Sequence, residues 1–327
     1  MTRFFLGASQ EEFPPEDLVR QAVEAESAGF DGVSSSDHLQ PWWEGGESGH
    51  TWPWLGAAGQ ATKTVPLGTG VTSTGARYHP ALIAQAWMTL ERLFPGRMFL
   101  GIGSGEALNE VPVGDDWPSV EDQIARMDEA LSIIDRLWKG EKLSEPGRFY
   151  RTQDTKLHTL AKRRPPIWVS AFGPKAAEVA GRRGDGLWTL PDPESTPDVI
   201  EAFRSARGDD GGEIVFQALF SWARTDEEAM ESARKWKGAQ PEDHYTDDWH
   251  QPSKMYLHGE SEMSDEEFAE QAIVGSDAEL HIERIRELEQ LGATVIVLQN
   301  NSGADPLGAI RFYGEHVLPA LRGVRAG

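Results

Sequence analysis

Short apolar segments alternate with amphipathic segments along most of this chain, and this alternation restricts the fold more than any other feature. Apolar residues three and four positions apart predict helices in segments such as 17–28, 80–93 and 120–138. Eight segments between and around such helices predict strands, at residues 4–8, 32–36, 67–72, 98–103, 167–171, 186–190, 214–223 and 294–298. The pattern predicts a parallel (β/α)8 TIM barrel spanning residues 1–327 as a single domain. A doubly wound open sheet is the alternative, because periodicity does not give the order of strands.

Two segments interrupt the alternation. Residues 140–152 predict a hairpin inserted before the fifth strand, because Glu145-Pro146-Gly147 is a turn signal. Residues 238–275 are rich in acidic, Ser, Trp and Tyr residues and are long for a barrel connection. We expect this second segment to be an insertion that borders the substrate pocket; a disordered acidic loop is the alternative.

The chain is strongly acidic, with 53 Asp and Glu residues against 31 Lys and Arg residues and a net charge of -22. Such a surface repels phosphate backbones and anionic lipids, so nucleic acid and membrane surfaces are not expected partners. The acids recur on several predicted helices, which suggests a protein of a high-salt cytoplasm, where ions screen such a charge. An ordinary acidic soluble enzyme is the alternative.

The chain contains no cysteine, which excludes disulfides, thiolate metal sites and a cysteine nucleophile. No apolar run reaches the ~20 residues that cross a bilayer. The N-terminus Met1-Thr2-Arg3-Phe4 lacks the pattern of a signal peptide. We therefore expect a cytoplasmic protein.

The sequence Ser36-Asp37-His38-Leu39-Gln40-Pro41-Trp42 follows the second predicted strand. A barrel places its chemistry at the C-terminal ends of its strands, so His38 is a candidate for proton transfer, with a carboxylate and an indole beside it. The fourth predicted strand ends in Gly101-Ile102-Gly103-Ser104-Gly105-Glu106, which brings Glu106 to the same mouth. A carboxylate and an imidazole there can divide acid and base roles. Loop capping by His38 and pairing of Glu106 with a helix N-terminus are the structural alternatives.

Glycines shape the ends of three predicted strands. Alternate glycines at 101, 103 and 105 let a planar ligand or a phosphate approach the backbone, but they do not form the dinucleotide-binding fingerprint. The end of the third strand, residues 67–74, has room for a planar ring or is an ordinary strand with a glycine bulge. Gly173-Pro174-Lys175 begins a helix and could hold a cofactor phosphate, or could simply cap that helix.

Together, residues 36–42, Tyr78-His79-Pro80-Ala81-Leu82-Ile83-Ala84-Gln85-Ala86 and residues 101–110 resemble the luciferase-like barrel superfamily, and within it the coenzyme F420-dependent glucose-6-phosphate dehydrogenase group. The resemblance implies a homodimer that binds F420 and oxidises an alcohol or sugar hydroxyl. It implies that His38 is the base, that Glu106 protonates or stabilises the reduced ring and that Trp42 shapes the pocket. It also implies a cis peptide at Gly70-Val71. The cofactor positions that it implies are Asp37, Gly70, Val71, Thr74, Ser104, Gly105, Ala171, Phe172 and Gly173.

One departure from the group concerns the substrate. Where the sugar-phosphate enzymes hold phosphate with a Thr, a Lys and an Arg, this chain has Leu190, Pro193 and Gln271. We therefore expect an alcohol, a free sugar or another polyol rather than glucose 6-phosphate. An FMN-dependent luciferase-like monooxygenase and a barrel without catalytic activity are the alternatives to an F420-dependent dehydrogenase.

Overall fold

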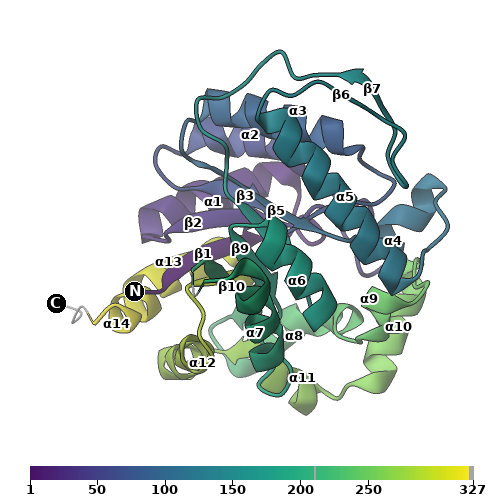
Figure 1. Cartoon of the computed structure of the whole chain (residues 1–327). Coiled ribbons are helices and arrows are strands. Elements are labelled where there is room, and N and C mark those ends of the chain that lie inside the picture. Colours follow the sequence, from purple (N-terminus) through teal and green to yellow (C-terminus); the bar gives the residue numbers. More distant parts are fainter. Residues whose placement is uncertain (210, 324–327) are drawn as a thin grey trace.

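The computed structural model describes residues 1–209 and 211–323, and its centre is a closed barrel of parallel strands (Figure 1). β12 pairs with β1 and β10 pairs with β9, so the ring of strands has no free edge. This closure confirms the barrel and excludes the open sheet. In order around the ring, the strands are β1 (Arg3–Ala8), β2 (Gly32–Ser35), β3 (Leu67–Thr69), β5 (Met98–Gly103), β8 (Ile167–Ser170), β9 (Gly186–Thr189), β10 (Glu213–Trp222) and β12 (Val295–Asn300).

Helices cover the outside of the barrel, and a proline in the first turn starts several of them, where its missing N–H costs no hydrogen bond. The longer ones are α1 (Pro15–Ala28), α2 (Thr51–Ala61), α3 (Pro80–Leu93), α5 (Val120–Trp138), α6 (Pro174–Arg183), α7 (Thr196–Arg207), α8 (Asp226–Ala233), α12 (Ala278–Gln290) and α13 (Pro306–Phe312). Two short helices are α4 (Ala107–Glu110) and α14 (Leu318–Leu321). Among residues 1–209 and 211–323, no helix is long and apolar enough to cross a membrane.

The third predicted strand is shorter than expected. It stops at Thr69, and a separate two-residue strand, β4 (Thr72–Ser73), pairs with β5. The peptide bond between Gly70 and Val71 is cis, as the resemblance implied. The hairpin is present as the antiparallel pair β6 (Leu143–Glu145) and β7 (Thr152–Thr155).

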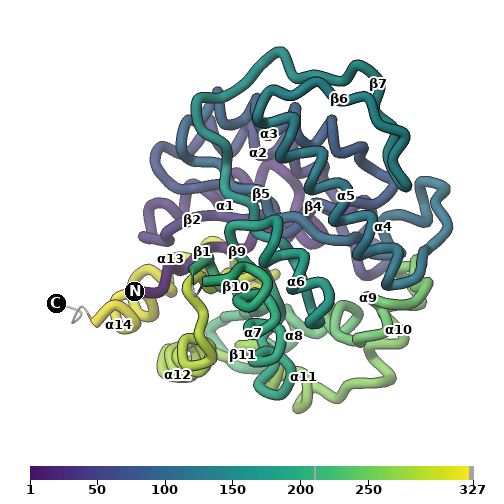
Figure 2. The backbone as a smooth tube through the Cα atoms, viewed as in Figure 1, coloured from purple at the N-terminus to yellow at the C-terminus, as the bar shows by residue number. Residues whose placement is uncertain are grey.

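Residues 238–275 form short helices along one side of the molecule (Figure 2). These are α9 (Asp243–Thr246), α10 (Pro252–Glu262) and α11 (Asp265–Gln271), followed by β11 (Ile273–Gly275), which pairs with the end of β10. The segment has apolar contacts of its own: Met255 and Phe268 are buried in one cluster with Trp42 and Leu108 of the barrel loops. It therefore packs directly on the loop that follows His38.

Large side chains fill the interior of the barrel, so some strand positions have no room for a Cβ atom. Phe99 and Trp168 stack with ring centroids 4.4 Å apart inside the barrel. Gly101 of β5 lies against the neighbouring strand, where an added Cβ would stand 2.0 Å from the Thr69 carbonyl oxygen. The close approach of these two strands thus depends on glycine at position 101.

We expect Gly101→Ala to lower the free energy of unfolding by about 3 kcal/mol, because the methyl group forces two backbones apart. Denaturant unfolding followed by circular dichroism measures the change. The matched control is Gly56→Ala in α2, where an added Cβ meets nothing within 4 Å. That control should raise stability by roughly 0.5–1 kcal/mol, because alanine favours helix. Equal stability of the two variants would contradict the argument.

Candidate active site

A cavity of about 710 Å³ lies where the barrel strands end. Residues from the ends of β2, β5, β8 and β9 line its inner part, and Tyr245 and Gln240 of segment 238–275 form part of its border. The lining also includes Pro193, and Leu288 and Leu291 at the end of α12. The cavity thus coincides with the end of the barrel at which the sequence predicted the chemistry.

His38 stands between two carboxyl groups in the inner part of the cavity. Its Nε2 atom lies 3.4 Å from Oε1 of Glu11 and 3.4 Å from Oε2 of Glu106. The His38 side chain is only 11% exposed, the Glu11 side chain 2% and the Glu106 side chain 22%. Three titratable groups therefore meet in a nearly dry place, with Glu106 the most open to the cavity.

Asn109 of α4 fixes the orientation of the His38 ring. Its Oδ1 atom accepts hydrogen bonds from the backbone N–H groups of Leu39 (2.7 Å) and Gln40 (3.4 Å), so its Nδ2 group must face the cluster. Nδ2 lies 3.3 Å from Nδ1 of His38 and donates to Oε2 of Glu106 at 3.1 Å. Because the amide donates, Nδ1 of neutral His38 is the acceptor and Nε2 carries the proton toward the carboxyl groups.

Burial shifts the pKa of each group in this cluster toward its neutral form. Loss of solvation raises the pKa of Glu11 to about 7 and raises the pKa of Glu106, while it lowers the pKa of His38. Ser36 donates a hydrogen bond of 2.6 Å to Glu11 and opposes part of its shift. Pairs of groups with strongly perturbed pKa values are typical of catalytic sites.

Asp37 and Glu110 lie behind the cluster and share one buried cation, Arg77. The Arg77 guanidinium donates to the Asp37 carbonyl at 2.6 Å and to Glu110 at 3.3 Å. The Asp37 carboxylate also accepts from Thr72 (2.6 Å) and from the ring N–H of Trp52 (3.2 Å). Asp37 is therefore held firmly in the cavity wall.

Aromatic rings close one side of the cavity. The rings of His38 and Trp42 have centroids 5.2 Å apart, Trp42 and Tyr245 are 5.7 Å apart, and Tyr245 and Phe172 are 5.5 Å apart. Tyr245 is held by its hydroxyl group, which donates to the Ala239 carbonyl at 2.6 Å. This row of rings connects three separate parts of the chain and limits the access of water to His38.

The structure brings most of the residues predicted for the site to the cavity. Its lining includes His38, Glu106, Trp42, Asp37, Gly70, Val71, Ser104, Gly105 and Phe172. Thr74, Ala171 and Gly173 are not among the lining residues. Thr74 is fully buried, with its hydroxyl group donating to the Gly103 carbonyl at 3.0 Å, and Ala171 is 3% exposed.

Sequence reasoning missed four residues that shape the site: Glu11, Arg77, Asn109 and Tyr245. Glu11 had an available signal, because Glu11-Glu12 follows the first predicted strand, as Asp37-His38 follows the second. Asn109 lies within the motif at 101–110 but was not singled out. Arg77 lies in an irregular segment and Tyr245 lies in the four-residue helix α9, which is too short to show a periodic pattern.

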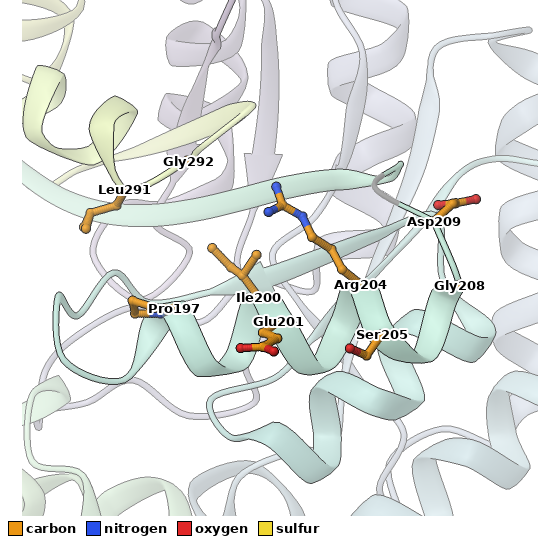
Figure 3. A pocket seen from close by; sticks show the side chains of 9 residues that line it. All are labelled: Pro197, Ile200, Glu201, Arg204, Ser205, Gly208, Asp209, Leu291 and Gly292. Atoms are coloured by element: carbon orange, nitrogen blue, oxygen red, sulfur yellow. The ribbon is translucent and has the colours of Figure 1, made fainter.

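A second hollow lies between α7 and the turn before β12 (Figure 3). Ile200 and Arg204 of α7 line it with Leu291, a residue that also lines the cavity. None of the site residues predicted from sequence lines this hollow. It therefore plays no part in the assignment of the active site.

The buried Glu11 predicts a pH-dependent stability. Its pKa rises from 4.5 to about 7 on folding, so the folded chain holds this proton more tightly than the unfolded chain. The contribution of protonated Glu11 to the free energy of unfolding is fully present below the pKa of Glu11 in the unfolded chain. It is lost as the pH rises through the pKa of Glu11 in the folded chain. We expect the wild type, relative to Glu11→Gln, to lose up to about 3 kcal/mol of unfolding free energy between about pH 5 and about pH 8. Denaturant titrations at both pH values measure this; a constant difference would contradict a raised pKa.

Comparisons with known proteins agree with the barrel over nearly the whole chain. The model of the luciferase-like monooxygenase family matches residues 1–295. The chain is 37% identical to an F420-dependent glucose-6-phosphate dehydrogenase of Microbacterium testaceum, over 98% of this chain and 97% of that protein. It is also 37% identical to an F420-dependent hydroxymycolic acid dehydrogenase of Mycobacterium tuberculosis, over 96% of this chain and 87% of that protein. A solved F420-dependent secondary alcohol dehydrogenase, in complex with an F420-acetone adduct, has a TM-score of 0.91 and 32% identity, covering 98% of this chain and 99% of that one.

Proposed function

The chain belongs to the luciferase-like monooxygenase family, and we propose that it is an F420-dependent dehydrogenase that oxidises the CH–OH group of an alcohol or of a sugar hemiacetal. Its relatives named above are F420-dependent enzymes that act on different hydroxyl compounds. One observation of this chain carries the proposal: His38 is held between Glu11 and Glu106 in the cavity. Removal of a hydroxyl proton as hydride leaves the same carbon requires such a set of groups.

The residues present fit a planar deazaflavin. Gly70, Val71, Gly103 and Gly105 line one stretch of the cavity wall, where little side-chain bulk separates a ligand from the backbone. Gly105 has φ +98° and an added Cβ would stand 2.5 Å from Ser73 Oγ, so only glycine suits this place. We assign cofactor contact to Asp37, Gly70, Val71, Ser104, Gly105 and Phe172, which line the cavity. Thr74, Ala171 and Gly173, which the resemblance also implies, do not line it. When bound, F420 supplies a ring carbon that accepts hydride.

The cluster around His38 moves the protons. We propose Glu11, with a pKa of about 7, rather than His38, the base that the resemblance implies, as the group that accepts the hydroxyl proton at a carboxylate oxygen. In neutral His38, Nδ1 accepts from Asn109 and Nε2 already carries a proton. His38, fixed by Asn109, directs its Nε2–H toward the two carboxyl groups. Glu106 keeps a raised pKa at the more open face of the cluster, where it would supply a proton to the reduced ring of the bound cofactor, or stabilise that ring. Two carboxyl groups with different surroundings thus take different roles.

The charges that line the cavity favour a substrate without phosphate. Leu190, Pro193 and Gln271 all line it, and none of them is cationic. Among the described lining residues the basic side chains are Arg77 and Arg284, and each already contacts acids or carbonyl groups of this chain. The lining also includes seven acidic residues, of which Glu11 and Glu106 are shifted toward the neutral form by burial and five others add to the acidic character: Asp37, Asp192, Glu242, Glu270 and Glu287. A phosphate dianion would meet repulsion here, whereas a neutral alcohol or sugar would not.

A substrate panel tests the proposal. Purified protein is given F420 and, in turn, 2-propanol, 2-butanol, glucose and glucose 6-phosphate at high salt, and reduction is followed at the deazaflavin absorbance band. We expect a neutral alcohol or sugar to be oxidised with kcat/KM about 100-fold above that of glucose 6-phosphate, because like charges cost several kcal/mol. Preference for glucose 6-phosphate would overturn the substrate class, and tight binding of FMN with oxygen consumption would overturn the activity in favour of a monooxygenase.

The homodimer and the high-salt cytoplasm stay predictions. Sedimentation velocity tests the first, with two chains per particle expected. Circular dichroism during dilution from molar salt tests the second, because the charge of -22 is tolerated best where ions screen it. Retention of full structure in dilute buffer would contradict the second prediction.

A further inference from the structure

Three potential metal ligands meet in segment 238–275, outside the His38 cluster. Asp243 and His244 lie on α9, and His258 lies on α10. Their ligand atoms all lie within 4.8 Å of one another, with His244 Nε2 2.8 Å from His258 Nδ1 and Asp243 Oδ1 3.9 Å from the same nitrogen. Two imidazoles and a carboxylate that converge in this way form a common donor set for a transition-metal ion.

Hydrogen bonds and a stacking contact with neighbouring residues orient these three side chains toward one another. Nδ1 of the fully buried His244 lies 2.9 Å from the Gly238 carbonyl, so it carries the proton, and the Nε2 lone pair points toward Nδ1 of His258. The ring N–H of Trp249 donates to Oδ2 of Asp243 at 3.1 Å, which leaves Oδ1 for a metal. The Trp249 ring also stacks on His258, with centroids 4.5 Å apart and planes at 12°. Metal-binding His and Asp residues are typically held by contacts of this kind.

We propose that Asp243, His244 and His258 bind a Zn²⁺ ion that joins α9 to α10, with water as the fourth ligand. In tetrahedral geometry two zinc-bound nitrogens stand roughly 3.3 Å apart. His244 Nε2 and His258 Nδ1 are 2.8 Å apart, so a shift of His258 by about 0.5 Å brings the two nitrogens to the spacing that zinc requires. His258 is the ligand with freedom to move, because its side chain is 24% exposed. Its proton moves from Nδ1 to the outer Nε2 through water, so the ring stays neutral. Mg²⁺ and Ca²⁺ prefer sites made of oxygen atoms alone.

The site has a consequence for the border of the active-site cavity. Tyr245 follows His244 directly on α9, and its ring packs on Trp42 and on Phe172. Fixing α9 to α10 through the metal would hold Tyr245 in place against these rings. The proposal does not depend on F420 or on the identity of the substrate.

Zinc binding by the untagged full chain tests the proposal. Protein freed of metal with a chelator is titrated with zinc sulfate against a chromophoric competitor, and bound zinc is counted by mass spectrometry after dialysis. We expect one zinc ion per chain in the wild type and at least a 100-fold loss of affinity in His258→Gln and in Asp243→Asn. Trp249→Phe keeps the stacked ring but loses the N–H, so we expect about 10-fold weaker binding. His250→Gln is the matched control, since His250 pairs with Asp248 at 2.6 Å in the same segment.

X-ray absorption of the zinc-loaded wild type keeps the test independent of how the variants fold. Two imidazole nitrogens and oxygen at about 2.0–2.1 Å are expected in the first shell. No retained zinc in the wild type, a shell without imidazole, or an equal loss of affinity in His250→Gln would each overturn the proposal.

Discussion

His38→Asn lowers kcat/KM for alcohol oxidation by about 10²–10⁴-fold, the range expected when acid–base catalysis is lost, and leaves F420 affinity within a few-fold. The shorter side chain cannot reach both Glu11 and Glu106, which now lie 3.4 Å from Nε2. Both carboxyl groups then lose their contact with Nε2, so the proton acceptor loses its position. Stopped-flow reduction of the deazaflavin with a neutral alcohol, together with fluorescence titration of F420, measures both quantities.

The control for this variant is His316→Asn, because the His316 side chain is 55% exposed on the C-terminal helices. Its activity should equal that of the wild type. Full activity of His38→Asn would contradict the assigned role, and the absence of turnover in the wild type would favour a barrel without catalysis. The apparent pKa values in the pH profile of kcat/KM should describe Glu11, His38 and Glu106 together and not any one of them, because ionisable groups this close titrate as a coupled set.

The barrel and the position of the active site could be predicted from the sequence because both follow from local patterns. Alternation of apolar strands and helices gives the fold, and strand ends share one face, so Asp37-His38 and Glu106 had to meet there. The end of the third strand was predicted less well. Apolar and small residues continue through position 72, but the cis peptide at Gly70-Val71 separates β3 from β4, and periodicity does not register the peptide geometry.

The rest of the site depends on contacts between distant segments. Tyr245 reaches Trp42 only because segment 238–275 folds back on the loop after β2, where Gln40 donates to the His250 carbonyl at 3.1 Å. Arg77 has a role only because Asp37, in the loop after β2, and Glu110, at the end of α4, converge on it. Thr74 is the converse case, a residue that was predicted for the site but does not line the cavity. Its hydroxyl group donates to the Gly103 carbonyl inside the protein. Such contacts are a property of packing, and one sequence does not contain them as a pattern.

Glu106→Gln lowers kcat by about 10²-fold or more, because the amide cannot hold and release a proton at the open face of the cluster. Its size is nearly unchanged, so F420 affinity and stability should stay close to those of the wild type. Glu44→Gln, at an exposed position on the loop after Trp42, is the matched control and should be fully active.

The double variant His38→Asn/Glu106→Gln shows whether the two residues act together. Asn109 contacts both side chains, at 3.3 Å and 3.1 Å, so loss of either one disturbs the other. Residues that act as a unit give strongly non-additive losses. We therefore expect the kcat of the double variant to be only slightly below the kcat of the less active single variant. If the two losses multiply, His38 and Glu106 act independently, and the coupling between them through Asn109 is wrong.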